Sequence, residues 1–382
     1  MAEQIYLNHA ATSLKKPPAV IAALVSYLQQ NEEIALQRSF LGQGTAQNAF
    51  EARTAVAEFF AATDASHVIF TPNVTTSLNM ILKGGLQPGD HVLTTSVEQN
   101  SISRPLEQLQ QQEIEYSRLP CDSTGCVDPA AISKMIRPNT KMLVMTHASN
   151  VLGTIQPVEK CFEIAKAKGL LTVLDTAQTA GFLPIDMEAL QADVIAFTGH
   201  KSLLALAGIG GFVLNEEAVK RIQPWLTGGT GSFSELAEMP TVLPDRFEPG
   251  TPNDMGIRSL TASLGWLQEQ TIAKVADHER GLTQRFIDGL QQLPVRLLGT
   301  GLDNRSVPVV SVVPQNISCD ELAFTLFADY GIVTRNGLHC APWAHEVAGT
   351  LASGAVRFSF GWDTTTDEID KTLLALNKLL KA

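Results

Sequence analysis

The sequence predicts an α/β fold in which helices cover both faces of a mostly parallel sheet. Between residues 67 and 215, apolar segments of strand length alternate with stretches whose apolar residues recur at helical spacing. The strand segments are nearly continuous apolar runs, which is typical of strands buried on both faces. The 382 residues are also too many for one hydrophobic core, so we expect two domains.

Seven segments predict the strands of this sheet. They are 67–72 (HVIFTP), 90–96 (DHVLTTS), 114–120 (IEYSRLP), 141–149 (KMLVMTHAS), 171–177 (LTVLDTA), 193–199 (DVIAFTG) and 208–215 (GIGGFVLN). Segments 74–85 and 157–169 predict helices between the strands, and the second has Pro157 at its start and Gly169 at its end.

The pattern changes after the loop at 228–254. A long helical stretch begins near Ile257, and the segments that follow predict strand, helix, strand and a C-terminal helix; the first three are 307–314, 318–331 and 354–361. This order predicts a smaller α+β domain. We expect a large domain over 17–256, with 1–16 and 257–382 forming the small domain.

Composition excludes several classes of protein. The net charge of −11 is spread without runs, which argues against nucleic-acid and anionic-membrane partners. No apolar segment is long enough to span a bilayer, and the N-terminus lacks the pattern of a signal peptide, so a cytoplasmic protein is expected. Five scattered cysteines do not form a disulfide framework, and we expect no metal site.

Polar residues at predicted strand ends indicate a binding site, because ligands of such sheets bind beyond the carboxyl ends of the strands. Asn73, Thr75 and Thr76 lie at a strand-to-helix turn. The exposed N–H groups and the dipole of a helix start favour a phosphate there. Simple capping of the helix would explain the same residues.

Two further strand ends carry isolated polar side chains. Asp175 follows four apolar or β-branched residues, with Gln178 three positions later, and Asn150 follows another strand. A buried aspartate needs a partner, and none is adjacent in the sequence. Local turn chemistry is the alternative explanation for each of these residues.

Lys201 is the one lysine of a stretch, 196–212, whose other residues are almost all apolar or small, and it follows Thr198 and His200 at a third strand end. A lone lysine could extend its ammonium to solvent. A lysine, the Asp175 carboxylate and an anion-binding turn on one side of one sheet instead fit pyridoxal phosphate, which needs a Schiff-base lysine, a carboxylate facing the ring nitrogen and a phosphate cradle.

A dinucleotide site is the competing interpretation. The glycine-rich segments 207–213 (AGIGGFV) and 228–234 (GGTGSFS) invite it. Neither places GxGxxG between a first strand and its helix, so the context does not fit.

With these residues in place, the chain resembles the class V aminotransferase family of fold-type-I pyridoxal-phosphate enzymes, and within it the cysteine desulfurase/selenocysteine lyase group. The resemblance runs from YLNHAATS to AVRFSFG, nearly the whole chain. The motifs between them, in family order, are FTPNVTTSLN, SNVLGTIQP, VLDTAQTAG, TGHKSLLALAGIGG, RFEPGTPN and RNGLHCAPWAH.

The resemblance implies a role for each residue of a cofactor site. Lys201 would bind pyridoxal phosphate as a Schiff base, Asp175 would face the pyridine nitrogen and Gln178 the phenolic oxygen. The phosphate would be held by Thr75, Thr76, Thr198 and His200. Thr251 would reach the phosphate of the neighbouring subunit, so the resemblance also implies a homodimer.

The resemblance further implies an L-cysteine substrate. Asn150 would contact both cofactor and substrate, and Arg357 and Arg335 would bind the substrate; the fork of a guanidinium matches both oxygens of a carboxylate. Cys340 lies near Arg335 in a segment whose cations favour thiolate. It would take the substrate sulfur as a persulfide and leave L-alanine. A separate protein would then be the final sulfur acceptor.

One position departs from the group. Gln99 stands where most desulfurases have a histidine that stacks on the cofactor ring, and glutamine does not titrate near neutral pH. Proton transfer would then fall to Lys201, His9 or His339. The alternatives are a related C–S lyase, a selenocysteine lyase, an epimerase, an aminotransferase, or a binding protein without catalysis.

Overall fold

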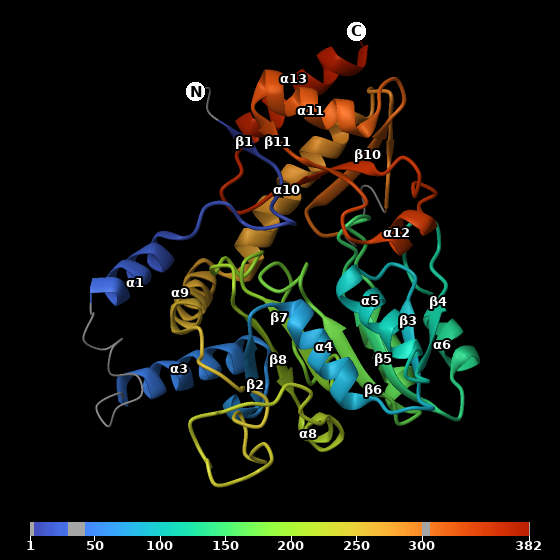
Figure 1. The fold of residues 1–382 in the computed structure, drawn as a ribbon. Helices are drawn as coiled ribbons and strands as arrows, with labels where there is room; N and C mark the ends of the chain where they lie inside the picture. Colours follow the sequence, from blue (N-terminus) through green and yellow to red (C-terminus); the bar gives the residue numbers. More distant parts are fainter. Residues whose placement is uncertain (1–3, 30–42, 300–305, 382) are drawn as a thin grey trace.

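The computed structural model describes residues 4–29, 43–299 and 306–381. The chain forms a large sheet with its helices and, above it in the view of Figure 1, a smaller sheet covered by the C-terminal helices. In the described ranges, no helix combines the length and the apolar character needed to cross a bilayer.

The large sheet contains every strand predicted for it. In sheet order the strands are β2 (Val68–Thr71), β8 (Gly210–Leu214), β7 (Val194–Thr198), β6 (Leu171–Asp175), β5 (Thr140–Thr146), β3 (His91–Thr95) and β4 (Glu115–Leu119). Strands β3 to β7 run parallel, whereas β8 is antiparallel to both neighbours. The predicted mostly parallel sheet is therefore confirmed.

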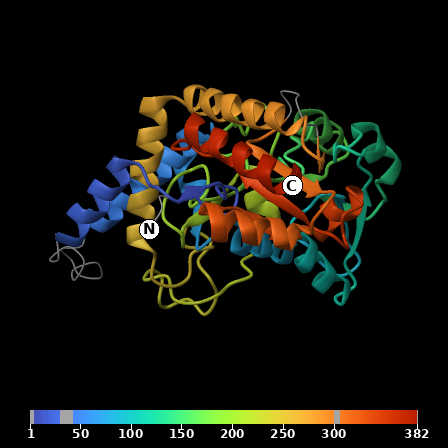
Figure 2. The ribbon, with the colours of Figure 1, turned by 90° about the horizontal axis from the view of Figure 1, so that it is seen from above.

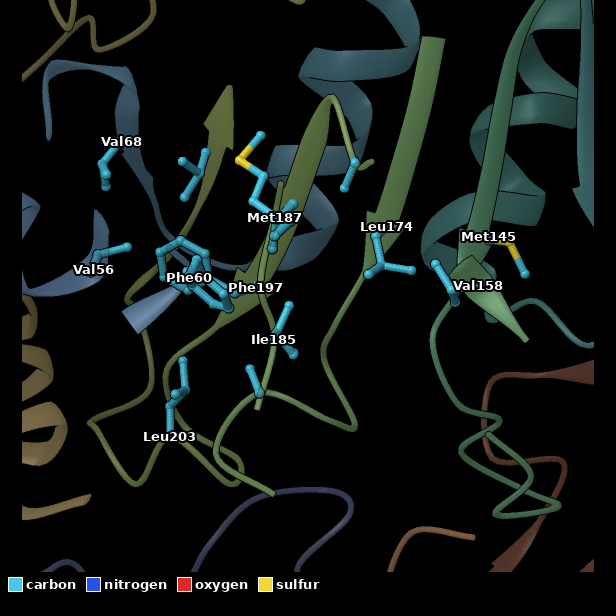
Figure 3. Close-up of a cluster of buried hydrophobic side chains, with 14 of the residues drawn as sticks. Val56, Phe60, Val68, Met145, Val158, Leu174, Ile185, Met187, Phe197 and Leu203 are labelled. Atoms are coloured by element: carbon cyan, nitrogen blue, oxygen red, sulfur yellow. The ribbon is translucent and has the colours of Figure 1, made fainter. Parts of the chain in front are cut away.

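Helices cover both faces of this sheet because alternate residues of a strand point to opposite sides. On β7, Ile195 and Phe197 join one buried cluster, and Val194 and Ala196 join the cluster on the other face. Figure 3 shows Phe197 beside Phe60 in the first cluster. The helices of the first face are α3 (Gln43–Phe59), α6 (Pro129–Met135), α7 (Val158–Lys166) and α9 (Asp254–Gln270). Those of the second are α4 (Val74–Gly85), α5 (Asn100–Gln110) and α8 (Glu216–Arg221).

The two helices predicted between the strands lie where the sequence placed them. Helix α4 spans the predicted range, and the side chain of Asn73 caps it by accepting the backbone N–H of Thr76 at 3.0 Å. Helix α7 begins directly after Pro157, and Gly169 adopts a left-handed φ of 72° beyond its end.

The C-terminal sheet is antiparallel. Its strands, in sheet order, are β12 (Arg335–Gly337), β13 (Ala355–Ser359), β10 (Val309–Pro314) and β9 (Val295–Leu297). The predicted strands 307–314 and 354–361 are β10 and β13. Strands β9 and β12 escaped prediction because three residues carry too little periodicity to identify a strand.

The C-terminal helices pack on this sheet and on one another, as Figure 2 shows from above. The remaining helices are α1 (Pro18–Gln29), the 3₁₀ turn η1 (Ala65–His67), α10 (Ile272–Leu290), α11 (Cys319–Tyr330), α12 (Pro342–Val347) and α13 (Thr366–Lys381). Strand β1 (Ile5–Tyr6) pairs in parallel with β11 (Ile332–Val333), so the N-terminal strand joins C-terminal structure.

The expected domain boundaries stay a prediction. Helix α9 begins at Asp254, three residues before the predicted start at Ile257, and it packs against the large sheet. Helix α10 contributes Val275 to the same cluster as α9 and Phe286 to the C-terminal core.

Candidate active site

A cavity of about 570 Å³ lies at the carboxyl ends of β5, β6 and β7. Of the residues predicted to bind the cofactor or the substrate or to accept the sulfur, all line this cavity except Cys340 and Thr251. The lining residues that were predicted are Thr75, Thr76, Gln99, Asn150, Asp175, Gln178, Thr198, His200, Lys201, Arg335 and Arg357. Parallel strands bring residues far apart in sequence to one edge of a sheet, which is why these side chains meet.

Lys201 and Asp175 enter the cavity from neighbouring strands. Asp175 is the last residue of β6, and Lys201 follows the end of β7 by three residues. Burial lowers the pKa of Lys201 to about 8, although the charge of Asp175 opposes this shift. Burial also raises the pKa of Asp175, whose Oδ1 accepts the backbone N–H of Ala177 at 2.9 Å. An amine that loses its proton near neutral pH is suited to act as a nucleophile or a base.

The cavity also has residues that suit an anion. The first turn of α4, including Thr75 and Thr76, lines it. The hydroxyl of Thr198 is buried and has no hydrogen-bond partner within the described residues. A buried orphan hydroxyl is unfavourable unless a ligand satisfies it, and a phosphate oxygen would do so. The residues present therefore fit the phosphate of pyridoxal phosphate.

Two glutamines also line the cavity. Gln178 donates from Nε2 to the carbonyl of Ala10 at 3.2 Å. Gln99 caps helix α5, because its Oε1 accepts the N–H of Ser101 at 2.6 Å. The capping bond fixes the side chain of Gln99 at the cavity wall.

Arg357 lines the cavity and is buried, with 1% of its surface exposed. Its Nη1 donates to the carbonyl of Asn150 at 3.0 Å, and its Nη2 donates to Oδ1 of Asn8 at 3.2 Å. Its Nε has no partner in the part of the chain that the structure describes. Burial, helped by the charge of Arg335, lowers the pKa of Arg357 to about 9. This guanidinium still has donors to offer a carboxylate.

Cys340 lies beside the cavity without lining it. The residue is exposed, and its Sγ lies 3.3 Å from Nη2 of Arg335, which does line the cavity. Arg335 can therefore donate a hydrogen bond from Nη2 to this sulfur. Its neighbour His339 also lines the cavity, so the thiol stands at the cavity edge.

Thr251 is the other predicted residue outside this cavity. It is exposed and lines an adjoining pocket of about 410 Å³, of which Thr76 is also part. Thr251 therefore shares a pocket with Thr76 but does not line the cavity of its own chain.

Glu98 was not predicted; it does not line the cavity, but it accepts a hydrogen bond from the N–H of Thr146, which does. Glu98 is fully buried; its Oε1 accepts from the hydroxyl of Thr95 at 2.6 Å and from the N–H of Thr146 at 3.0 Å. Burial raises the pKa of Glu98 to about 8. The sequence signal for Glu98 was a lone acidic residue in the segment TTSVEQN.

His9, considered for proton transfer, does not line the cavity, and its Nε2 instead lies 3.8 Å from Oδ1 of Asp363.

The chain is similar to known proteins over nearly its whole length. The aminotransferase class-V model matches residues 5–372. A probable cysteine desulfurase of Vibrio cholerae is 32% identical over 383 residues, covering 98% of this chain and 93% of that protein. The apo cysteine desulfurase of Thermococcus onnurineus superposes with a TM-score of 0.90 at 30% identity, covering 99% of this chain and 95% of that one. The Escherichia coli cysteine desulfurase CsdA gives 0.88 at 28% identity, with 99% and 95% coverage. The chain belongs to the aminotransferase class-V family.

Proposed function

We propose that this chain is a pyridoxal-phosphate-dependent cysteine desulfurase. It converts L-cysteine to L-alanine and transfers the sulfur to Cys340, whose thiol becomes a persulfide. The observation that carries the proposal is the single cavity that holds Lys201, Asp175 and an anion-binding helix start, with Cys340 and Arg335 at its edge. The relatives named cysteine desulfurase support the same reaction.

The cavity has a group for each part of the cofactor. Lys201 would bind its aldehyde carbon, and Asp175 would hold a proton on its ring nitrogen. Gln178 would face the phenolic oxygen, and Gln99 would lie against the ring. The phosphate would be held by Thr75, Thr76, Thr198 and His200. Once bound, the cofactor would draw electrons from the substrate carbon that carries the amino group.

The substrate would be held by its carboxylate. Arg357 offers the fork of donors that a carboxylate needs, with Asn150 and Arg335 on the same wall. Asn8 and the carbonyl of Asn150 orient the guanidinium. The amino acid would then lie with its side chain toward Arg335, the residue that contacts Cys340.

Lys201 would move the proton at the α-carbon. Its lowered pKa provides a neutral amine near neutral pH. Gln99 has no titrating group with which to share this task. The Cys340 sulfur would attack the substrate sulfur. A new S–S bond would form, the bond between the substrate sulfur and the β-carbon would break, and the β-carbon would be protonated to give alanine.

A homodimer is part of this proposal. The exposed apolar residues Ile21, Val25 and Leu28 recur along one side of α1, at the edge of the molecule in Figure 1. A stripe at this spacing is suited to packing against a partner. A second copy would also bring its own Thr251 to the phosphate end of this cavity. We further propose a cytoplasmic enzyme that delivers persulfide sulfur to an acceptor protein.

The test is turnover of L-cysteine by protein loaded with pyridoxal phosphate, in the presence of a reductant. We expect equal amounts of alanine and sulfide and no pyruvate. Cys340→Ala should lose both products while Cys126→Ala, a matched change at a half-buried cysteine, keeps them. Wild-type yields of sulfide from Cys340→Ala would refute the role of Cys340.

A related activity is the second candidate, and Gln99 favours it because the usual ring-stacking histidine is absent from that position. The same assay separates the candidates. Pyruvate and ammonia would indicate a β-eliminating C–S lyase, and D-cysteine would indicate an epimerase. Alanine from L-cysteine without any of these products supports the desulfurase.

A further inference from the structure

The turn that carries Cys340 has an unusual backbone. His339 and Cys340 are consecutive non-glycine residues with φ values of 52° and 57°. Side chains with a Cβ rarely adopt this left-handed region, and two in succession are rarer still. The surrounding structure must therefore hold the turn in place.

Two residues that follow strands of the large sheet donate hydrogen bonds to the backbone carbonyls of this turn. The N–H of Asn100, at the start of α5, donates to the carbonyl of Cys340 at 2.7 Å. The side chain of Asn150 donates to the carbonyl of His339 at 2.8 Å. Both hydrogen bonds depend on the direction in which the left-handed backbone points the carbonyls of His339 and Cys340.

The side chain of His339 belongs to a series of hydrogen bonds that includes His345 and Thr350. Its Nε2 lies 3.0 Å from the carbonyl of Arg335, and its Nδ1 lies 3.2 Å from Nε2 of His345. His345 in turn places Nδ1 2.7 Å from the hydroxyl of Thr350. The two imidazole rings are stacked, with centroids 5.5 Å apart and planes 14° apart.

One assignment of hydrogens satisfies all three contacts. A carbonyl only accepts, so Nε2 of His339 donates to Arg335, and Nδ1 of a neutral His339 accepts. Nε2 of His345 must then donate to it, and Nδ1 of His345 accepts from the Thr350 hydroxyl. Burial keeps both rings neutral, because it lowers the pKa of His339 to about 3 and that of His345 to about 4. His339 and His345 are almost fully buried, at 2% and 0% exposed.

These hydrogen bonds occupy both ring nitrogens of His339. His339 lines the cavity, yet neither nitrogen is available to exchange a proton with a substrate. Its side chain instead ties the start of the turn, at Arg335, to helix α12 and the segment after it. The same arginine carries the guanidinium that contacts the Sγ of Cys340.

We infer that His345 is a positioning residue: through His339 it holds the left-handed turn that keeps the Cys340 sulfur beside Arg335 at the cavity edge. Its role in turnover rests on the proposed function, because that reaction needs Cys340 as the sulfur acceptor. The geometry of the turn itself does not depend on that function.

Two amide variants separate this role from ordinary packing. In His345→Gln, the longer side chain brings an N–H to the place of Nε2 and keeps the bond to His339, but it loses the acceptor for Thr350. In His345→Asn, the shorter side chain keeps an acceptor for Thr350 and does not reach His339. Each variant loses one hydrogen bond of the chain, so a merely structural role predicts the same effect from both.

The first readout is hydrogen exchange at the backbone amides of Asn100 and Ala341, measured on the whole protein. The Asn100 amide bonds Cys340, and the Ala341 amide bonds the carbonyl of Leu338 at 2.8 Å. His345→Asn should exchange about tenfold faster at both amides, the equivalent of one buried hydrogen bond, and His345→Gln should stay within about twofold of wild type. Equal changes in the two variants, or none in either, would overturn the inference.

The second readout is alanine formation from L-cysteine. His345→Asn should lower kcat by about tenfold, and His345→Gln should restore most of it. Faster exchange in His345→Asn alone, with normal alanine formation by Cys340→Ala, would support the role of His345 in the turn and refute the proposed function instead.

Discussion

Arg357→Lys should weaken the binding of the substrate while leaving the fold intact. The guanidinium of Arg357 bonds Asn150 and Asn8 and keeps Nε free of partners within the described residues. A lysine has one ammonium and cannot serve these acceptors and a carboxylate together. A hydrogen bond to a charged group contributes about 1.5–3 kcal/mol, so its loss should lower kcat/KM about 10- to 100-fold.

The assay is the initial rate of alanine formation over a range of L-cysteine concentrations. The loss should fall mainly on KM, because the carboxylate is bound in the substrate and in the transition state alike. Arg296→Lys, at an exposed arginine of β9 in the same sheet, is the matched control and should leave kcat/KM unchanged. A value for Arg357→Lys within about twofold of wild type, at equal cofactor loading, would refute the assigned role.

Three further predictions follow from burial. Lys201 must lose its proton to act as a base, so turnover should rise with pH through about 8, and a pH-independent rate across that value would contradict its role. Burial raises the pKa of Glu98 from 4.5 to about 8. Between these two pH values, Glu98 is therefore protonated in the folded protein and ionised in the unfolded chain. Relative to Glu98→Gln, the free energy of unfolding of the wild type should therefore fall as pH rises from about 5 to 8, by at most about 1.4 kcal/mol per pH unit, as urea titrations at each pH would measure. Phe197→Ala should lower the free energy of unfolding by about 3–5 kcal/mol, because the fully buried ring packs against Phe60 with centroids 5.4 Å apart; a loss below about 1 kcal/mol in urea unfolding would mean that the cluster repacks.

Much of the large sheet and of the cavity could be predicted from local patterns. The strands of the sheet are buried on both faces, and such strands must be apolar throughout, so their positions are visible in the sequence. Asp175 and Lys201 stand out for the same reason, because a charged side chain at the end of an apolar run has few structural explanations. The topology of parallel strands then places both at one edge.

The contacts that orient these groups could not be predicted in the same way. Asn8 bonds Arg357 across 349 positions of sequence, and no local pattern signals such a contact. Glu98 was passed over because its partners come from β3 and from the end of β5. In the sequence, His345 is an ordinary residue of a short segment, and only the hydrogen bond between its Nε2 and Nδ1 of His339 gives it a role.

The sequence by itself determined the fold class, the family resemblance and the identity of the groups that would carry the chemistry, because each depends on residue type and on spacing within one element. Only the tertiary structure decided that His9 stays out of the cavity, that Arg335 contacts Cys340, and that both nitrogens of His339 are occupied. These facts depend on the direction of side chains and on partners from distant segments. The physical reason is that hydrogen bonds and charge interactions act over a few ångströms in space, whatever separates the residues along the chain.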